Sequence, residues 1–149
     1  MSVLELGNRC STQPYTARSV NFDPKAPPAG QRYFFHYTDC PSAASICDEG
    51  VYHVSKGGIC GPGMYVTDIA PERGCFEELK RVIFGLHSAD LYQGVVAVVD
   101  SDPPSFFIDV DERVWKHDGA ADEDIQLEGL ALAHGCWDGA EWAWHFATH

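Results

Sequence analysis

The chain has few basic residues and no long apolar run, and these two shortages exclude two classes of target. Only 10 of its 149 residues are lysine or arginine, against 22 aspartates and glutamates, so its formal net charge at pH 7 is -12. Nucleic-acid affinity comes largely from lysine and arginine displacing counterions, so no nucleic-acid partner is expected. No stretch approaches the roughly 18 uninterrupted apolar residues of a membrane span, so we expect no membrane partner.

A secretory signal and a dense set of cysteines are also missing. Residues 1–10 carry Glu5 and Arg9 and contain no apolar core after a basic start. The sequence therefore predicts a cytoplasmic protein, or one delivered into a target cell by a route that leaves no N-terminal mark. Six cysteines could form three disulfides, but their density is well below that of a disulfide-held scaffold, so we expect reduced thiols.

The length and composition are those of one globular domain. A chain of 149 residues with 45% hydrophobic and 12% aromatic residues can bury one sizeable core, so we expect a single domain over residues 1–149. The first 30 residues end in the proline-rich stretch Asp23–Gly30. Because prolines at that density disfavour helices and inner strands, residues 1–30 are predicted to form an irregular lead-in.

Hydrophobic periodicity and turn residues predict two helices and several strands. The first helix should begin at Asp39 or Ser42, which are good N-cap residues, and end at Gly50. The second should lie within Pro71–Gly85, where apolar residues recur at spacings of three and four. Strands are predicted at residues 31–38, 51–55, 64–68, 94–100, 106–110, 113–115 and 124–130. This order predicts an α+β fold with a mixed, mostly antiparallel sheet and one or two helices.

Two short segments combine residues suited to nucleotide chemistry. The first is Phe35-His36-Tyr37-Thr38, and the second is Gly61-Pro62-Gly63-Met64-Tyr65-Val66-Thr67-Asp68, which follows a glycine-rich loop. Together they resemble the His-Tyr-Glu branch of the ADP-ribosyltransferase superfamily, and more closely its small toxin-type family with a His-Tyr-Asp signature. The resemblance covers about Tyr33 to Pro71 well and the rest of the chain in outline.

The resemblance implies a small ADP-ribosyltransferase-like fold and an enzyme that breaks the nicotinamide–ribose bond of its substrate NAD⁺, without a metal. In such an enzyme His36 would hold the ribose, Tyr65 would stack on the nicotinamide, and the backbone of Tyr37 would meet the nicotinamide amide. The implied nucleotide-binding residues are His36, Tyr37, Thr38, Gly61, Gly63 and Tyr65. The activity would be that of an ADP-ribosyltransferase or an NAD⁺ glycohydrolase, in a toxin or effector with a protein acceptor or an inhibitory partner.

The chemistry of the reaction agrees with this assignment. Cleavage passes through an oxocarbenium-like state, so the protein must orient the nicotinamide and stabilise positive charge on the ribose. An aromatic face is a stacking platform, and a histidine nitrogen can hydrogen-bond a ribose hydroxyl. Taken singly, His36 is more simply a core histidine and Tyr65 a strand-packing residue. The two motifs together reverse that preference.

A carboxylate should complete the site by pairing with the ribose 2′-hydroxyl and facing the developing charge. Glu112 is the first candidate, because the segment Asp111–Trp115 is similar to the Asn-Glu-Tyr-x-Val pattern of related polymerases. Its acidic neighbourhood, with Asp109 and Asp111, is most simply a solvated charge cluster.

Three further carboxylates are weaker candidates. Glu128 is second, because Gln126-Leu127-Glu128 resembles the Gln-x-Glu arrangement of some transferases and would place both polar side chains on one face of a strand. Asp109 and Asp100 are third and fourth, since an Asp-signature family could place its acid at the end of the sheet strand before Glu112.

Two alternative interpretations stay open. A catalytically silent module on the same fold would bind a nucleotide or a partner protein, and it would need no third residue. A zinc site is suggested by ligand-type residues, but these lack the closely spaced cysteine pair that makes such a pattern specific. The residues in question are Cys40, Cys47, His53 and Cys60.

Overall fold

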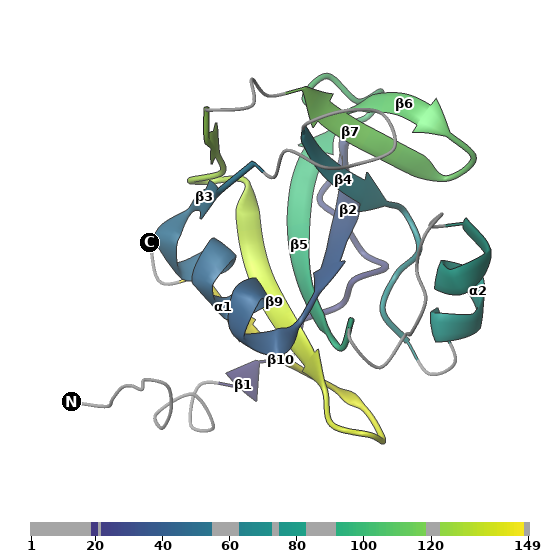
Figure 1. The fold of residues 1–149 in the computed structure, drawn as a ribbon, viewed down its shortest axis with the longest axis vertical. Helices are drawn as coiled ribbons and strands as arrows, with labels where there is room; N and C mark the ends of the chain where they lie inside the picture. The colour runs from purple at the N-terminus through teal and green to yellow at the C-terminus, as the bar shows by residue number, and fades with distance from the viewer. Residues whose placement is uncertain are drawn as a thin grey trace.

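An eight-stranded antiparallel sheet forms the framework of the protein (Figure 1). The computed structural model describes residues 19–20, 22–54, 63–72, 75–82, 92–118 and 123–147. The strands of this sheet lie in the order β1-β10-β9-β5-β2-β4-β7-β6. Their bounds are β1 Ser19–Val20, β2 Gln31–Thr38, β4 Gly63–Thr67, β5 Gly94–Ser101, β6 Ile108–Asp111, β7 Val114–Asp118, β9 Ala131–Trp137 and β10 Trp142–Phe146. A second small sheet pairs β3 (Val51–Tyr52) with β8 (Ile125–Gln126).

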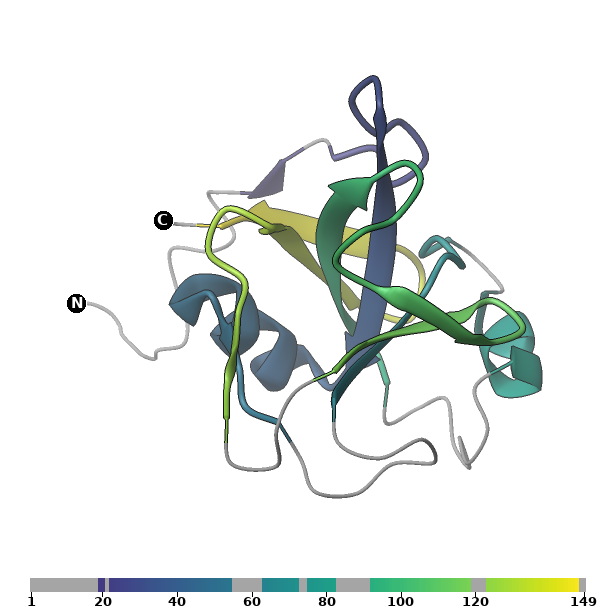
Figure 2. The same cartoon turned by 90° about the horizontal axis from the view of Figure 1, so that it is seen from above.

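Two helices lie on either side of this sheet, α1 (Cys40–Glu49) and α2 (Cys75–Val82) (Figure 1 and Figure 2). The Asp39 side chain accepts a 2.8 Å hydrogen bond from the Ser42 amide at the start of α1. Gly50 ends the helix in a left-handed conformation with φ 70°. Both ends agree with the sequence prediction, because a short polar side chain caps free N–H groups and glycine tolerates positive φ. Neither described helix has the length and apolar content needed to cross a membrane.

Alternating side chains of β2 divide the core into two clusters. Phe34 belongs to the cluster that contains Ala43 of α1 on one face, and Phe35 belongs to the cluster that contains Leu79 of α2 on the other. Successive strand residues point to opposite faces, so β2 serves both layers. Residues Val95–Val99 of β5 are buried throughout, as expected for a strand covered on both sides. The α+β class and the antiparallel sheet are thus confirmed.

Several predicted strands have other bounds. The strand predicted at 124–130 is limited to β8, because a turn containing Gly129 at φ 81° follows Leu127. Of the strand predicted at 51–55, residues 51–52 form β3, residues 53–54 lie outside it, and residue 55 is not among the described residues. The C-terminal residues beyond 130, for which no strand was predicted, form the β9–β10 hairpin. β10 also pairs with Ser19–Val20, so the lead-in is not irregular throughout. The sequence did not predict β9 because several of its residues are small. One of them, Gly135, lies beneath the Trp144 ring, and a β-carbon at Gly135 would come within 3.2 Å of the ring atoms.

The expectation of reduced thiols is wrong for one pair, because Cys40 and Cys136 form a disulfide with their Cα atoms 5.5 Å apart. The β5–β9 register places Cys136 opposite Gly94. A β-carbon on Gly94 would lie 2.4 Å from the Asp39 carbonyl oxygen, so the start of α1 packs directly on this strand pair. Cysteine density along the chain cannot reveal a contact between residues 96 positions apart. Among described cysteines, Cys47 and Cys75 are buried and form no disulfide.

We predict that removing the disulfide destabilises the fold strongly. The bridge closes a loop spanning 96 positions, and restricting the unfolded chain to that extent corresponds to about 4 to 5 kcal/mol in the chain-entropy model. Thermal unfolding of wild type and of the Cys40→Ser/Cys136→Ser variant, with and without reductant, measures this effect. Reductant should lower the melting temperature of the wild type alone. An equal shift in both proteins would contradict the prediction.

Two histidines face each other beneath α1. His134 on β9 pairs with His145 on β10, and their ring centroids are 5.3 Å apart. Burial, and secondarily the neighbouring His145, lowers the pKa of His134 to about 4. Burial also lowers the pKa of His145, against the opposing effect of Asp48 on α1. The folded protein therefore keeps His134 neutral well below the pKa of a free imidazole, and it disfavours the protonated form of His145 as well.

Acid should consequently destabilise the protein through this pair. Since the folded pKa of His134 lies below the ordinary 6.5, the unfolded chain binds more protons below that pH. The free energy of unfolding should fall as pH drops from 6.5 towards 4, on the order of 3 kcal/mol from His134 alone. Urea titrations of wild type and His134→Gln at several pH values test this, with the exposed His53→Gln as control. Equal pH slopes in wild type and His134→Gln would refute it.

Candidate functional site

The structure brings the two sequence motifs together through one side chain. His36 Nδ1 lies 2.8 Å from the main-chain oxygen of Tyr65, on the neighbouring strand. A carbonyl oxygen only accepts hydrogen bonds, so Nδ1 donates and carries the proton. Nε2 of the neutral ring is then left with an acceptor lone pair. The Tyr52 ring of β3 meets the imidazole edge to face, with centroids 5.0 Å apart.

The strands β2 and β4 part at this contact. Over the described residues their ladder contains one registered pair, Phe35 with Thr67. Continuing that register would place Tyr37 opposite Tyr65. The Tyr65 carbonyl points to β2, because it accepts from His36. In an antiparallel ladder the backbone N–H and C=O groups of a hydrogen-bonded pair point towards each other. The backbone groups of Tyr37 therefore point towards β4, two residues past the registered pair of Phe35 and Thr67.

The rings of His36 and Tyr65 leave the sheet on opposite faces. His36 follows the alternation of Phe34, whose cluster contains Met64 and Val66. Tyr65 lies between those two residues in β4, so its side chain projects from the other face. A ligand that touches both rings would therefore have to bind where the β2–β4 ladder ends.

Burial determines the protonation of the motif side chains. It lowers the pKa of His36, while the hydrogen bond to the Tyr65 carbonyl acts in the opposite sense. Burial also raises the pKa of Tyr37 well above its ordinary value, and this phenol donates a 2.8 Å hydrogen bond to the Ile69 carbonyl. The Tyr37 side chain is thus part of the core, and only its backbone faces β4. Thr38, half-buried, ends β2.

The second motif glycine permits a close approach between strands. Gly63 has φ 149°, and a β-carbon there would lie 2.6 Å from the His117 carbonyl oxygen and 2.8 Å from Lys116 Cε. The chain that approaches Gly63 closely is therefore β7, whereas the motif predicted that a dinucleotide would lie there. Gly61 lies outside the described residues, as does Cys60 of the zinc interpretation.

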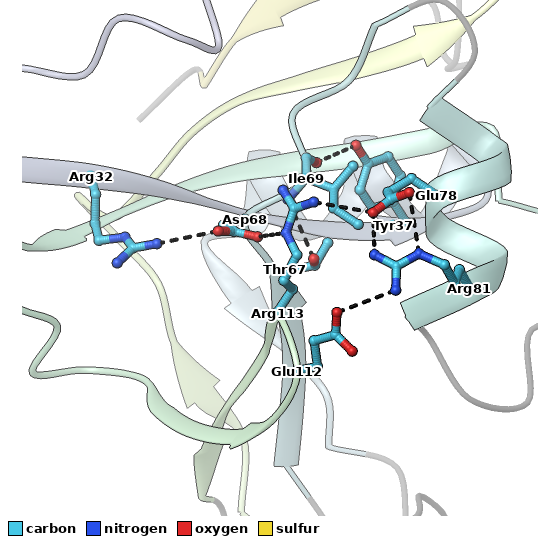
Figure 3. A network of polar contacts seen from close by, with 9 residues as sticks. All are labelled: Arg32, Tyr37, Thr67, Asp68, Ile69, Glu78, Arg81, Glu112 and Arg113. Carbon is cyan, nitrogen blue, oxygen red and sulfur yellow. Dashed lines mark hydrogen bonds and ion pairs between the residues drawn. The ribbon is translucent and has the colours of Figure 1, made fainter.

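Glu112 lies in a network of ion pairs at the end of β4 (Figure 3). Its carboxylate accepts a 3.2 Å hydrogen bond from Arg81 on α2, and its side chain is 67% exposed. Arg113 links Asp68 with Glu78, at 2.8 Å and 3.3 Å. The network therefore fastens α2 to the turn between β6 and β7, on the face of the sheet away from His36.

The other candidate acids lie in different surroundings. Glu128 is exposed in the turn before β9, and its neighbour Leu127 is buried in the cluster of Phe34. Asp100 is buried; burial opposes its ionisation, but hydrogen bonds from backbone amides, chiefly that of Phe107, lower its pKa overall. Asp100 thus organises the loop after β5. Asp109 is exposed on the edge strand β6.

The zinc interpretation loses one of its ligands, because Cys40 is held in the disulfide. His53 contacts Asp124 at 3.1 Å and Glu49 at 3.4 Å, and these two acids raise its pKa. Over the described ranges, no three histidine, cysteine or acidic side chains form a group that could hold a metal ion.

Two residues that lie beside the motif residues were not predicted from the sequence. Tyr52 reaches His36 from β3, and Lys116 lies opposite Tyr65 on β7. Both contacts depend on strand register, and neither residue stands near its partner in the sequence. Trp115 packs against the cluster that contains Phe34. Because side chains alternate along a strand, an apolar Trp115 facing that cluster indicates that Lys116 projects from the other face.

Comparison with known proteins adds no relative. No protein-family model, curated protein or solved structure matches this chain. The geometry of the described residues and the likeness of the two motifs are therefore the basis for the function proposed for this chain.

Replacing Gly63 with alanine should damage the site by separating β4 from β7. The new methyl group would overlap a backbone carbonyl, and the positive φ adds strain. Together these should cost about 2 to 4 kcal/mol of unfolding free energy. Gly139→Ala is a matched control, since its φ is 102° and nothing lies within 4 Å of a β-carbon there. Urea unfolding should show the larger loss in Gly63→Ala, and equal losses would contradict this account.

Proposed function

We propose that the protein binds NAD⁺ where β2 and β4 part and cleaves its nicotinamide–ribose bond, on an ADP-ribosyltransferase-like fold. The observation that supports this best is the bond from His36 Nδ1 to the Tyr65 carbonyl. In a continued ladder that carbonyl would accept from a backbone N–H of β2. Where the ladder ends, the His36 imidazole donates to this carbonyl in place of a backbone N–H. The backbone groups of β2 beyond that point are then left facing β4, beside the His36 side chain.

Each part of the substrate has a partner of suitable chemistry. The Tyr65 ring offers a flat face to the nicotinamide, and the Tyr37 backbone offers a donor and an acceptor to the carboxamide. The ribose is held by His36, whose Nε2 accepts a hydroxyl proton because Nδ1 is already committed to Tyr65. The glycosidic bond would thereby lie between two anchored groups, which is the positioning that dissociation requires.

The neutral state of His36 suits a reaction that develops positive charge. Bond cleavage turns the cationic nicotinamide into a neutral leaving group and moves the charge to the ribose. A protonated imidazole beside that ribose would repel it. Burial lowers the pKa of His36, so the ring holds the ribose without adding a like charge.

We assign the stabilising carboxylate to Glu128 ahead of Glu112. Tyr52, which touches His36, pairs with Ile125 of β8, and the chain reaches Glu128 shortly afterwards on the same side of the sheet. Glu112 is engaged by Arg81 on the α2 side. An arginine partner also reduces the negative charge that a carboxylate can offer to a cation.

Nicotinamide release from NAD⁺ by the purified protein tests this function. His36→Ala and Tyr65→Ala should each lower turnover at least about tenfold, because a ribose hydrogen bond and ring stacking each contribute on the order of 1 kcal/mol or more. Phe146→Ala, which truncates an exposed aromatic residue of β10, is the matched control. Glu128→Gln should lose more activity than Glu112→Gln.

The acceptor dependence separates the possible activities. Release without any acceptor indicates a glycohydrolase, and release that needs an added protein indicates a transferase. NAD⁺ binding without release under either condition would replace the proposed enzyme by a silent binding module. Wild-type turnover in both His36→Ala and Tyr65→Ala would refute the site itself.

A further inference from the structure

We propose that Lys116 binds the phosphate-bearing part of the nucleotide substrate. This inference rests on the proposed function, and it adds a binding residue that neither sequence motif contains. Lys116 belongs to β7 and is registered directly opposite Tyr65. Directly opposite residues of an antiparallel pair project from the same face of the sheet. The lysine and the stacking tyrosine therefore share one face of the sheet.

The ammonium group lies beside the proposed stacking platform. Lys116 Nζ is 5.9 Å from the centroid of the Tyr65 ring. The residue is only 8% exposed, which is unusual for lysine. A cation buried beside an aromatic ring is a strong local charge, because the surrounding dielectric screens it less than water does. Such a charge is suited to hold an anion, and a bound anion would offset its repulsion of the cationic nicotinamide stacked on the ring.

The glycine motif accommodates the stem of this lysine. A β-carbon on Gly63 would lie 2.8 Å from Lys116 Cε and 3.1 Å from its Cγ. The lysine stem thus crosses the space that a side chain at position 63 would fill. This contact links the motif glycine to the stem of Lys116, whose ammonium lies 5.9 Å from the Tyr65 ring centroid.

The overall charge of the chain favours a local cation at this site. A formal net charge of -12 repels the diphosphate of a dinucleotide, and positive charge at the point of contact would offset that repulsion. Lys116 supplies this charge next to the platform proposed for nicotinamide. A phosphate joined to the nicotinamide-bearing ribose is the nearest anion of such a substrate. We therefore assign Lys116 to that phosphate.

Two substrates that share the scissile bond test this assignment. NAD⁺ carries phosphates, and nicotinamide riboside has the same nicotinamide–ribose bond without them. Lys116→Met keeps most of the stem and removes the charge. It should raise KM for NAD⁺ at least about tenfold with little change in kcat, as expected for the loss of one charge-assisted contact. Turnover of the riboside should stay the same. Equal losses with both substrates would show a structural role and overturn the proposal.

Equilibrium binding separates this proposal from the enzymatic one. Calorimetry with ADP-ribose, which contains the diphosphate and lacks nicotinamide, should show at least about tenfold weaker binding by Lys116→Met and near wild-type binding by Lys116→Arg. Lys25→Met is the charge-matched control, since Lys25 is exposed and paired with Glu72. This difference without nicotinamide release would retain the phosphate contact and reject the enzyme. Equal affinity in wild type and Lys116→Met, or no binding by wild type, would overturn the role of Lys116.

A folding defect in Lys116→Met would be detected by circular dichroism and thermal unfolding. In that case Lys116→Gln and the salt dependence of wild-type binding carry the test. Affinity for ADP-ribose should fall as sodium chloride is raised, because salt screens an ammonium–phosphate contact. Salt-independent binding would overturn the assignment.

Discussion

The hydrogen bond from His36 to the Tyr65 carbonyl is the contact on which the rest of this site depends. It joins two motifs that are separated in the sequence. The donor is a side chain, whereas in a continuous sheet the donor would be a backbone N–H group. A backbone bond at that position would continue the ladder and consume the polar groups of both strands. The imidazole ends the ladder and keeps one nitrogen lone pair for another partner.

The two sides of this strand boundary are fastened by different means. On the β5 side, the disulfide between Cys40 and Cys136 ties α1 to β9. On the β4 side, Arg113 joins Asp68 to Glu78 and so ties β7 to α2 (Figure 3). Between them lies a single registered β2–β4 pair. The sheet is therefore held together by contacts around the boundary as much as by its ladder, which allows the strands to part without losing the fold.

Burial gives the ionisable groups near the sheet different roles. It keeps His36 and His134 neutral by lowering their pKa values, since a charged imidazole loses its hydration inside the core. Asp100 stays ionised although buried, because several backbone amides replace its lost water. Lys116 brings a cation against an aromatic ring. An acidic chain thus places neutral and positive groups where we propose that a dinucleotide binds.

Local chemistry in the sequence was sufficient for α1, with its Asp39 cap and Gly50 stop, and for β2 and β5, because capping, positive φ and strand preference act between near neighbours. It also predicted that His36 and Tyr65 lie close together, as the hydrogen bond between the His36 ring and the Tyr65 carbonyl shows. Strand register decided what lies around them: the opposite faces of the two rings, the approach of Lys116, the Arg81 partner of Glu112 and the Cys40–Cys136 bridge. These contacts join residues far apart in the chain, and a shift of one residue in any ladder would reverse which side chains meet.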